Sequence, residues 1–220
     1  MKTIGLFLVA MLGLVRVAVG APFEGRVIFL RAELGGAPHD IIYRVKGDRN
    51  RVEVMKDRVT TFLTDSKKAQ TTVILEDDMA WLVLPALAPR PETPRLEKTD
   101  ETAAVLGVPV RKYLVTGEEG TTELWLAEGF GKYTGFGEGF APPPVHIPGV
   151  DVPEPPDPRD WEYALAGKPL MPFRVSTRDS FGREVFRIEV RSITSQTLDD
   201  RMFGPSSTYR KLENWPKSAP

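Results

Sequence analysis

Apolar and polar residues alternate in short runs along the chain, and this pattern predicts β-strands over most of its length. Ile41, Tyr43 and Val45 fall on one side of an extended chain, because successive side chains of a strand point to opposite faces. Arg44 and Lys46 fall on the other side. The predicted sheet therefore has one dry face and one solvated face.

Turn residues such as Gly47-Asp48 and Asp77-Asp78 separate these runs at intervals of about ten residues, a spacing typical of all-β sandwiches and barrels. Consecutive strands joined by such tight turns indicate an antiparallel meander. The predicted strands cover residues 23–33, 39–47, 50–56, 59–65, 71–76, 79–84, 110–117, 121–129, 170–179 and 185–195.

Helical signals are few. One helix is predicted over residues 157–167, with Asp157 as its N-cap and Gly167 at its end, and a second short turn over residues 198–203. A sheet with so little helix to cover its apolar face is expected to curl over its own interior. We therefore predict a mainly β fold, a single curved antiparallel sheet forming a half-barrel or open barrel, with one or two short helices and a long Gly/Pro-rich loop over residues 129–158.

The N-terminal residues 1–20 have the features of a signal peptide. Lys2 precedes an apolar run over residues 4–15, and small residues then lead to a cleavage site near Gly20-Ala21. The apolar run is too short to cross about 30 Å of hydrocarbon, which makes a membrane anchor the weaker interpretation. We expect an exported, periplasmic or secreted protein with a single β-rich domain over residues 21–220 and no membrane span in the mature chain.

The composition narrows the chemistry that the chain can perform. Its 220 residues include no cysteine, and its formal net charge is −1. Disulfides, thiolate metal sites and cysteine nucleophiles are excluded, and the balanced charge argues against nucleic acid as a partner. The two histidines, His39 and His146, lack the spacing of metal ligands or of a catalytic triad. We predict no catalytic residues, no cofactor and no metal site, and keep a hydrolase with scattered carboxylates as a minor alternative.

Several motifs follow one another in an order that carries a resemblance. They are F-E-G-R-V at 23–27, Y-R-V-K-G-D-R-N-R-V-E at 43–53, L-G-V-P-V-R-K-Y at 106–113, T-E-L-W-L-A at 122–127, P-F-R-V-S-T-R-D at 172–179 and T-L-D-D-R-M-F at 197–203. In this order the chain resembles a family of exported bacterial proteins classed as a domain of unknown function, similar to the LolA/LolB-like lipoprotein-carrier half-barrel group. The resemblance implies a curved sheet whose concave apolar face holds a lipid, an acyl chain, a lipoprotein or an apolar peptide.

The candidate cavity residues are large apolar side chains within the predicted strands. They are Phe29, Tyr43, Met55, Phe62, Trp81, Tyr113, Trp125, Phe173 and Phe186. Small antiparallel barrels either fill their interior with such side chains or enclose one ligand. A packed core and a ligand cavity therefore both remain open for this set.

Aromatic residues also alternate with glycines at the start of the long loop, where Phe130, Tyr133, Phe136 and Phe140 are candidates for a mobile flap. Such a segment can dock on an apolar surface, and loops of this length inside a domain are often functional. A passive surface loop is the alternative interpretation.

A basic hairpin with Arg44, Lys46, Arg49 and Arg51 has two interpretations as well. It either faces anionic lipid headgroups or forms an ordinary solvated strand face. Further along, Asp199-Asp200 is expected to cap the short turn before Phe203.

Two functional hypotheses result. The first is a non-catalytic protein that binds an apolar ligand or a lipoprotein in the curved sheet. The second is a structural or protein-interaction module of the cell envelope with a filled core.

Overall fold

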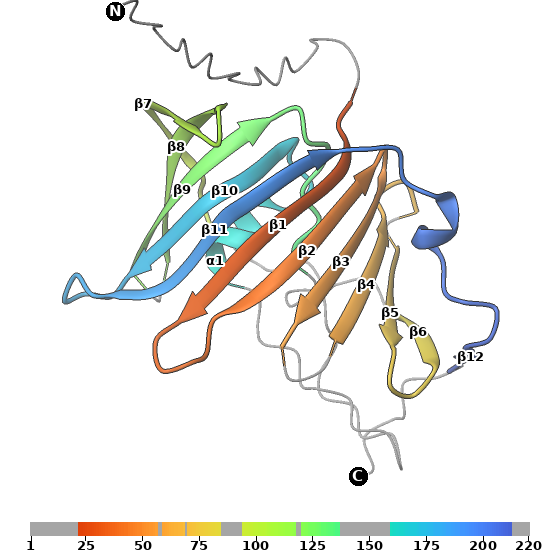
Figure 1. Ribbon diagram of the computed structural model, residues 1–220. Helices are drawn as coiled ribbons and strands as arrows, with labels where there is room; N and C mark the ends of the chain where they lie inside the picture. Colours follow the sequence, from red (N-terminus) through yellow and green to blue (C-terminus); the bar gives the residue numbers. More distant parts are fainter. Residues whose placement is uncertain are drawn as a thin grey trace, which may run out of the picture.

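The computed structural model describes residues 22–56, 59–68, 70–84, 94–117, 120–136 and 159–212, and all of its strands belong to one sheet. The sheet curves and stays open, so that it has a concave and a convex face (Figure 1). Its strands are β1 (Glu24–Glu33), β2 (His39–Lys46), β3 (Arg49–Met55), β4 (Val59–Asp65), β5 (Gln70–Leu75), β6 (Ala80–Leu84), β7 (Glu97–Val105), β8 (Val108–Gly117), β9 (Gly120–Glu128), β10 (Leu170–Arg178), β11 (Glu184–Ser195) and β12 (Arg210–Lys211).

The strand order is β12-β6-β5-β4-β3-β2-β1-β11-β10-β9-β8-β7. The meander predicted for the first six strands is confirmed, because each of them pairs with its sequence neighbour. Strand β11 pairs with the free edge of β1, so strands β11, β10, β9, β8 and β7 continue the sheet beyond β1. Strands β12 and β7 lie at the two ends of the sheet, which is therefore not closed into a barrel. All pairs are antiparallel except β12 with β6, which is parallel. The predicted mainly β, single curved sheet is therefore confirmed.

Two strands were not predicted, for physical reasons that differ. Strand β7 has the sequence EKTDETAAV and exposes side chains on both of its faces, so no apolar alternation marks it. Strand β12 has only two residues and owes its pairing to the position of the C-terminal segment beside β6. Sequence periodicity detects strands only where one face is buried.

The predicted helix is shorter than expected and begins later. Helix α1 covers Asp160–Leu165, with Arg159 as its N-cap residue in place of Asp157, which lies outside the described residues. The backbone N–H of Arg159 donates to the Glu162 carboxylate at 3.4 Å, so a side chain inside the helix satisfies the start of the first turn. Gly167 follows the helix with a φ of +73°, a left-handed conformation that glycine adopts without strain.

A C-terminal strap, residues 196–212, crosses the convex face from β11 to the edge strand β6. It contains the short 3-10 helix η1 (Asp200–Phe203), and the side chain of Asp199 accepts from the N–H of Arg201, which confirms the predicted cap. The side chain of Lys46 donates to the carbonyl of Leu198 at 2.5 Å. At its far end the strap forms β12, so it also covers the outer edge of β6.

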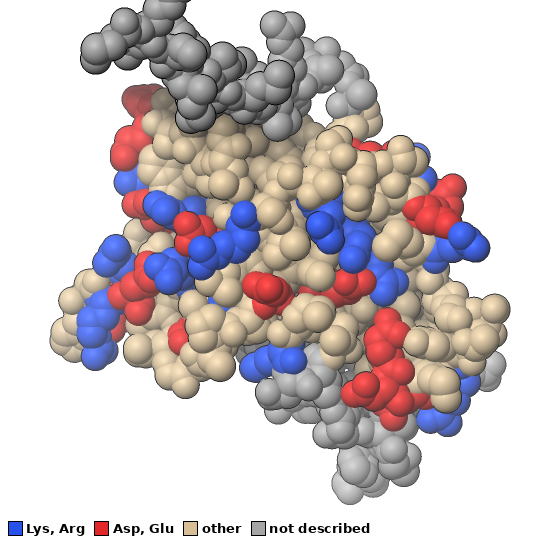
Figure 2. Space-filling view, in the orientation of Figure 1, with Lys and Arg blue, Asp and Glu red and all other residues tan. Residues whose placement is uncertain are grey.

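The basic hairpin faces this strap and neighbouring carboxylates. Arg44 forms an ion pair with Glu53 at 2.7 Å, and Lys46 and Arg49 contact Asp200 at 3.0 and 2.5 Å. Figure 2 shows acidic and basic side chains interspersed over this view of the molecule. The hairpin cations thus already have partners within the chain, which supports the ordinary strand-face interpretation.

The predicted signal peptide, residues 1–20, and most of the long loop, residues 137–158, lie outside the described residues, as do His146 and Phe140. Within the described ranges, no helix is long and apolar enough to cross a membrane.

Candidate functional site: the concave aromatic face

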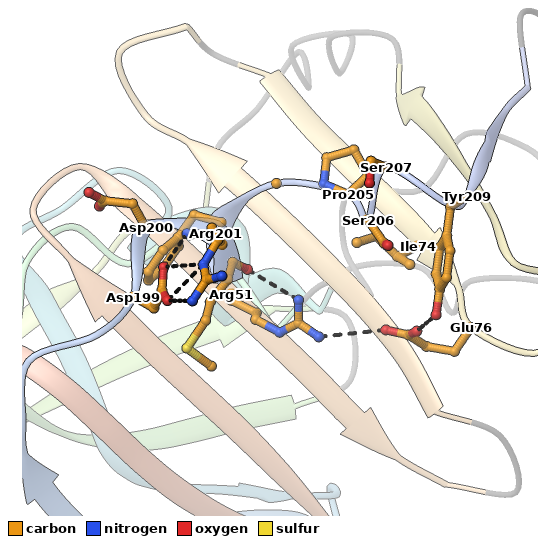
Figure 3. A pocket seen from close by; sticks show the side chains of 13 residues that line it. Arg51, Ile74, Glu76, Asp199, Asp200, Arg201, Pro205, Ser206, Ser207 and Tyr209 are labelled. Atoms are coloured by element: carbon orange, nitrogen blue, oxygen red, sulfur yellow. Dashed lines mark hydrogen bonds and ion pairs between the residues drawn. The ribbon is translucent and has the colours of Figure 1, made fainter.

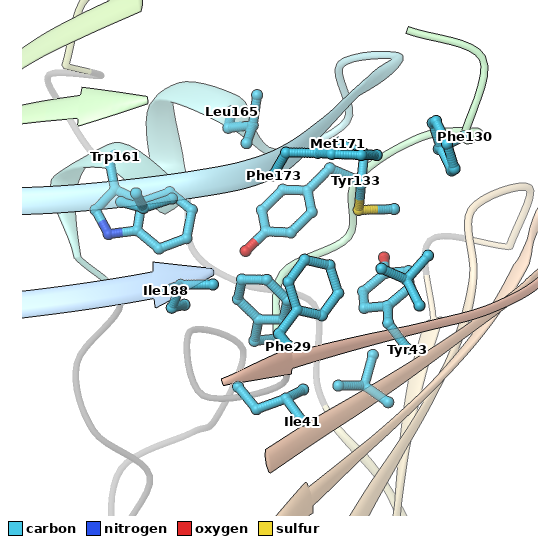
Figure 4. Close-up of a cluster of buried hydrophobic side chains, with 14 of the residues drawn as sticks. Phe29, Ile41, Tyr43, Phe130, Tyr133, Trp161, Leu165, Met171, Phe173 and Ile188 are labelled. Carbon is cyan, nitrogen blue, oxygen red and sulfur yellow. The ribbon is translucent and has the colours of Figure 1, made fainter. Parts of the chain in front are cut away.

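Five buried aromatic side chains from three separate parts of the chain meet at the concave face. Phe29 and Tyr43 come from β1 and β2, Tyr133 from the stretch after β9, and Trp161 from α1 (Figure 4). Phe136 follows Tyr133 in the same stretch. Each is at most 1% exposed. The ring centroids of Phe29 and Phe136 lie 4.9 Å apart, and those of Tyr133 and Trp161 6.1 Å apart. These distances are typical of packed aromatic pairs, so the rings fill this part of the concave face.

The stretch that contributes Phe130, Tyr133 and Phe136 is called the aromatic segment here and covers residues 130–136. This segment is not part of a strand, and its backbone forms hydrogen bonds with the turn after α1. The N–H of Tyr133 donates to the carbonyl of Lys168 at 3.0 Å, and the N–H of Gly167 donates to the carbonyl of Tyr133 at 2.8 Å. The aromatic segment and α1 therefore cover the sheet as one unit.

Thr134 connects the aromatic segment to the sheet through a small buried polar network. Its hydroxyl lies 3.0 Å from the hydroxyl of Tyr43, and its N–H donates to the same hydroxyl at 3.2 Å. The side-chain amide of Asn50, on β3, donates to the Thr134 hydroxyl at 3.0 Å. Burial raises the pKa of Tyr43 to about 12, so this hydroxyl stays protonated at neutral pH. The network fixes the aromatic segment at one position on the sheet.

Glu162 of α1 provides the second polar contact with the aromatic segment. The hydroxyl of Tyr133 donates to its carboxylate at 3.2 Å. Burial raises the pKa of Glu162, because a charged carboxylate loses its hydration in the interior. Burial and the nearby Glu162 also raise the pKa of Tyr133. Both groups are therefore biased toward their neutral forms, which lowers the cost of burying them.

Two arginines lie at the edge of the site, close to the ring of Phe186. The guanidinium carbon of Arg159 is 4.0 Å from the ring centroid, and that of Arg31 is 5.1 Å away. Arg31 also forms an ion pair with Glu33. Burial, together with Arg31, lowers the pKa of His39 beside them, so this histidine is neutral at physiological pH.

In the described part of the chain, no group of three or more His, Asp or Glu side chains is placed to hold a metal ion.

The structure separates the candidate cavity residues into three sets. The buried members on the concave face are Phe29, Tyr43, Phe62, Tyr113, Phe173 and Phe186. Trp81 and Trp125 lie on the convex face, because they alternate with the buried Leu82 and Leu124 in their strands. Met55 is 40% exposed at the end of β3. A plain list of large apolar strand residues cannot separate these sets, since the assignment depends on the register of each strand.

Of the candidate flap residues, Phe130, Tyr133 and Phe136 are buried against the concave face, and Phe140 lies outside the described residues. Sequence reasoning missed Trp161, Asn50, Thr134 and Glu162 as parts of the site. Trp161 and Glu162 lie within the predicted helix, but no local signal indicates which surface that helix covers. The sequence places Asn50 only at the start of a predicted strand.

A hollow lies on the convex face between the strap and strands β3 and β5. It is an open pocket of about 790 Å³, lined by Arg51, Ile74, Glu76, Tyr209 and strap residues 199–207 (Figure 3). Arg51 donates to the carbonyl of Met202 at 3.1 Å, and the hydroxyl of Tyr209 donates to the Glu76 carboxylate at 2.5 Å. These polar groups bond to one another and hold the strap in place, so we assign the pocket a structural role.

No family model matches the chain, and no curated protein sequence matches it. Among solved structures, PNGF-II shares 12% identity over 87% of this chain and 31% of its own, with a TM-score of 0.50. MucB, in the Pseudomonas aeruginosa MucA/MucB complex, shares 13% identity over 84% of this chain and 56% of its own, with a TM-score of 0.45. A LolA superfamily protein from Nitrosomonas europaea shares 12% identity over 83% and 90%, with a TM-score of 0.34.

These similarities concern the fold. The chain spans about a third of PNGF-II and somewhat more than half of MucB. The structural neighbours include LolA superfamily proteins and MucB. The class defined by fold and site is an open, curved sheet with an aromatic concave face.

Proposed function

We propose that the chain is a non-catalytic binding domain of the cell envelope that takes up an apolar ligand on its concave face. The ligand class is a lipid, an acyl chain, a lipoprotein or an apolar peptide. The observation that carries this proposal is the aromatic segment, which covers the apolar face of the sheet without being one of its strands. The ligand takes the place of this segment.

The exchange is physically reasonable because the hydrophobic effect depends on area and not on partner identity. Burial of a large apolar side chain contributes about 1.5–3 kcal/mol, so release of Tyr133 and Phe136 from the sheet is costly on its own. An acyl chain laid over Phe29 and Tyr43 covers the same surface and restores that contribution. Only the specific polar contacts of the aromatic segment are then lost.

The polar groups of the site support binding and not turnover. The Thr134 hydroxyl is used in the contact with Asn50 and Tyr43, and Glu162 accepts from Tyr133. Glu162 is buried and its carboxylate already accepts from Tyr133, so it is shielded from a substrate in water. The same groups serve to position the aromatic segment.

The experiment measures binding of a fluorescent fatty acid to the mature protein and to the Thr134→Val variant. Valine keeps the shape of threonine but removes its hydroxyl contacts, and each net hydrogen bond contributes about 1 kcal/mol, equivalent to about fivefold. The variant is expected to bind the probe about fivefold or more tightly, because less of the binding energy is spent on release of the segment. Native mass spectrometry of protein purified from its own envelope is expected to show a co-purified lipid.

The matched control is Thr122→Val. The Thr122 hydroxyl bonds to that of Thr177 at 2.8 Å between β9 and β10, so this variant removes a buried hydroxyl contact that does not involve the aromatic segment. This variant is expected to leave probe affinity unchanged. A probe that binds neither the mature protein nor Thr134→Val would contradict the proposal.

The filled packing of Tyr133, Phe136 and Trp161 favours the second candidate, a protein-interaction module whose core is permanently closed. In that case the probe does not bind, and envelope proteins co-purify in place of lipid. The two candidates thus give opposite results in the same preparation.

A further inference from the structure

The turns at one end of the sheet expose large apolar side chains. Phe181 in the β10–β11 turn is 82% exposed, and Leu34 in the β1–β2 turn is 68% exposed. Met55, where β3 leads into its turn, is 40% exposed. Isolated exposed apolar residues are common on protein surfaces, but several on adjacent turns need an explanation.

Strand register places these three turns side by side. Glu33, the last residue of β1, pairs with Phe186 near the start of β11, and a backbone bond from Leu34 to Val185 joins the two turns at 2.9 Å. Asp40 at the start of β2 pairs with Met55 at the end of β3. Figure 1 shows the β10–β11 and β1–β2 hairpins projecting from the same end of the sheet. We call Leu34, Met55 and Phe181 the docking tips.

The spacing of the docking tips favours a lipid surface over a protein partner. Adjacent turns are two strands apart, which corresponds to about 10 Å. Protein interfaces bury a continuous, closely packed patch, whereas side chains on separate projections can enter a bilayer interface one by one.

Charges of both signs lie beside the docking tips, and the cations among them suit this partner. The exposed residues of these turns include the cations Lys56 and Arg183 and the carboxylates Asp40 and Glu184. Asp179 is held within its own hairpin, where it accepts from the N–H of Phe181 at 2.9 Å and from the side chain of Arg183 at 2.8 Å. The guanidinium carbon of Arg183 lies 5.4 Å from the ring of Phe181. When the ring enters the interface, this guanidinium reaches the level of the lipid phosphates.

The next turn along the same end, between β5 and β6, marks the limit of the surface. It also exposes an apolar side chain, Met79, which is 61% exposed. However, Asp77 and Asp78 precede it, and two carboxylates are repelled by lipid phosphates. This turn is therefore expected to stay outside the contact.

We infer that the docking tips attach the protein to the surface of a phospholipid bilayer, with Leu34, Met55 and Phe181 entering the boundary between headgroups and acyl chains. Lys56 and Arg183 contact the phosphates. This surface is separate from the concave aromatic face, so the inference does not depend on the proposed ligand.

The test is co-sedimentation of the mature protein with vesicles of phosphatidylethanolamine and phosphatidylglycerol. The double variant Leu34→Ser, Phe181→Ser is expected to reduce the partition coefficient by about tenfold or more, since each side chain loses its apolar burial. Both positions are exposed, so the fold should persist, and probe uptake by the concave face should be unchanged.

The matched control is Leu106→Ser. Leu106 is 57% exposed in the β7–β8 turn, at the opposite end of the sheet, because Gly117 and Gly120 close the β8–β9 turn at the docking end. This variant should bind vesicles like the wild type. The inference is overturned if the wild type does not sediment with vesicles, or if Leu106→Ser reduces binding as much as the double variant.

Discussion

The two faces of the sheet are stabilised in different ways. On the concave face, aromatic rings from β1, β2, α1 and the aromatic segment pack at full burial, with a small polar network among them. On the convex face, the C-terminal strap is attached by ion pairs and hydrogen bonds at partly exposed side chains. Burial of apolar area gives the larger contribution per residue, while exposed ion pairs contribute little. The face that contributes most to stability is therefore also the proposed binding site, whereas the interactions on the convex face mainly order the strap.

The largest effect is expected on the concave face from Phe136→Ala. Its ring is fully buried and contacts Phe29, Tyr43, Tyr133 and Trp161. Removal of a buried phenyl ring costs about 3–5 kcal/mol in the free energy of unfolding. Denaturant unfolding followed by circular dichroism measures this value. A loss below about 1 kcal/mol would show that the site relaxes freely and would weaken the contrast between the faces.

An intermediate effect is expected from Glu162→Gln, and it depends on pH. Burial raises the pKa of Glu162 in the folded protein above its unfolded value. The stability contribution of this group is therefore complete below the unfolded pKa of about 4.3 and decreases as pH rises through the folded pKa. Glutamine does not titrate and still accepts from Tyr133, so the variant should be more stable than the wild type at neutral pH.

The advantage of Glu162→Gln should disappear toward pH 4, which unfolding measured across a pH series will detect. A constant difference at all pH values would mean that the carboxylate has the same pKa in both states.

The smallest effect is expected on the convex face from Asp200→Asn. Its carboxylate contacts Lys46 and Arg49 and is largely exposed. Loss of these ion pairs should lower Tm only slightly, and the difference should vanish in about 1 M salt, where charges are screened within about 3 Å. A loss of stability similar to that of Phe136→Ala would contradict the assignment of the two faces.

The sequence predicted the concave face well where alternation is regular. Ile41, Tyr43 and Val45 are all at most 1% exposed, as expected from their spacing of two. It failed for β7, whose exposed faces leave no pattern, and for Trp81, which shares its strand with Leu82 but points to the other face. Periodicity defines two faces but does not state which apolar set is the inner one when both contain large residues.

The site itself was predicted only in part for a related reason. Its polar network joins Asn50 and Thr134 across 84 positions of sequence, and Tyr133 and Glu162 across 29. Contacts between distant parts of the chain follow from the path of the backbone and leave no local signal. The aromatic spacing of Phe130, Tyr133 and Phe136 was visible, and the structure places these residues against the sheet, although a role as a flap remains a prediction.

The most direct test of the central claim, that a ligand replaces the aromatic segment, is hydrogen exchange with and without a bound fatty acid. The amides of Tyr133 and Gly167 are bonded to carbonyls in the free protein and should exchange slowly. With saturating fatty acid, we predict faster exchange at these two amides and unchanged protection in β1 and β2. Equal or greater protection of Tyr133 and Gly167 in the bound protein would contradict the account.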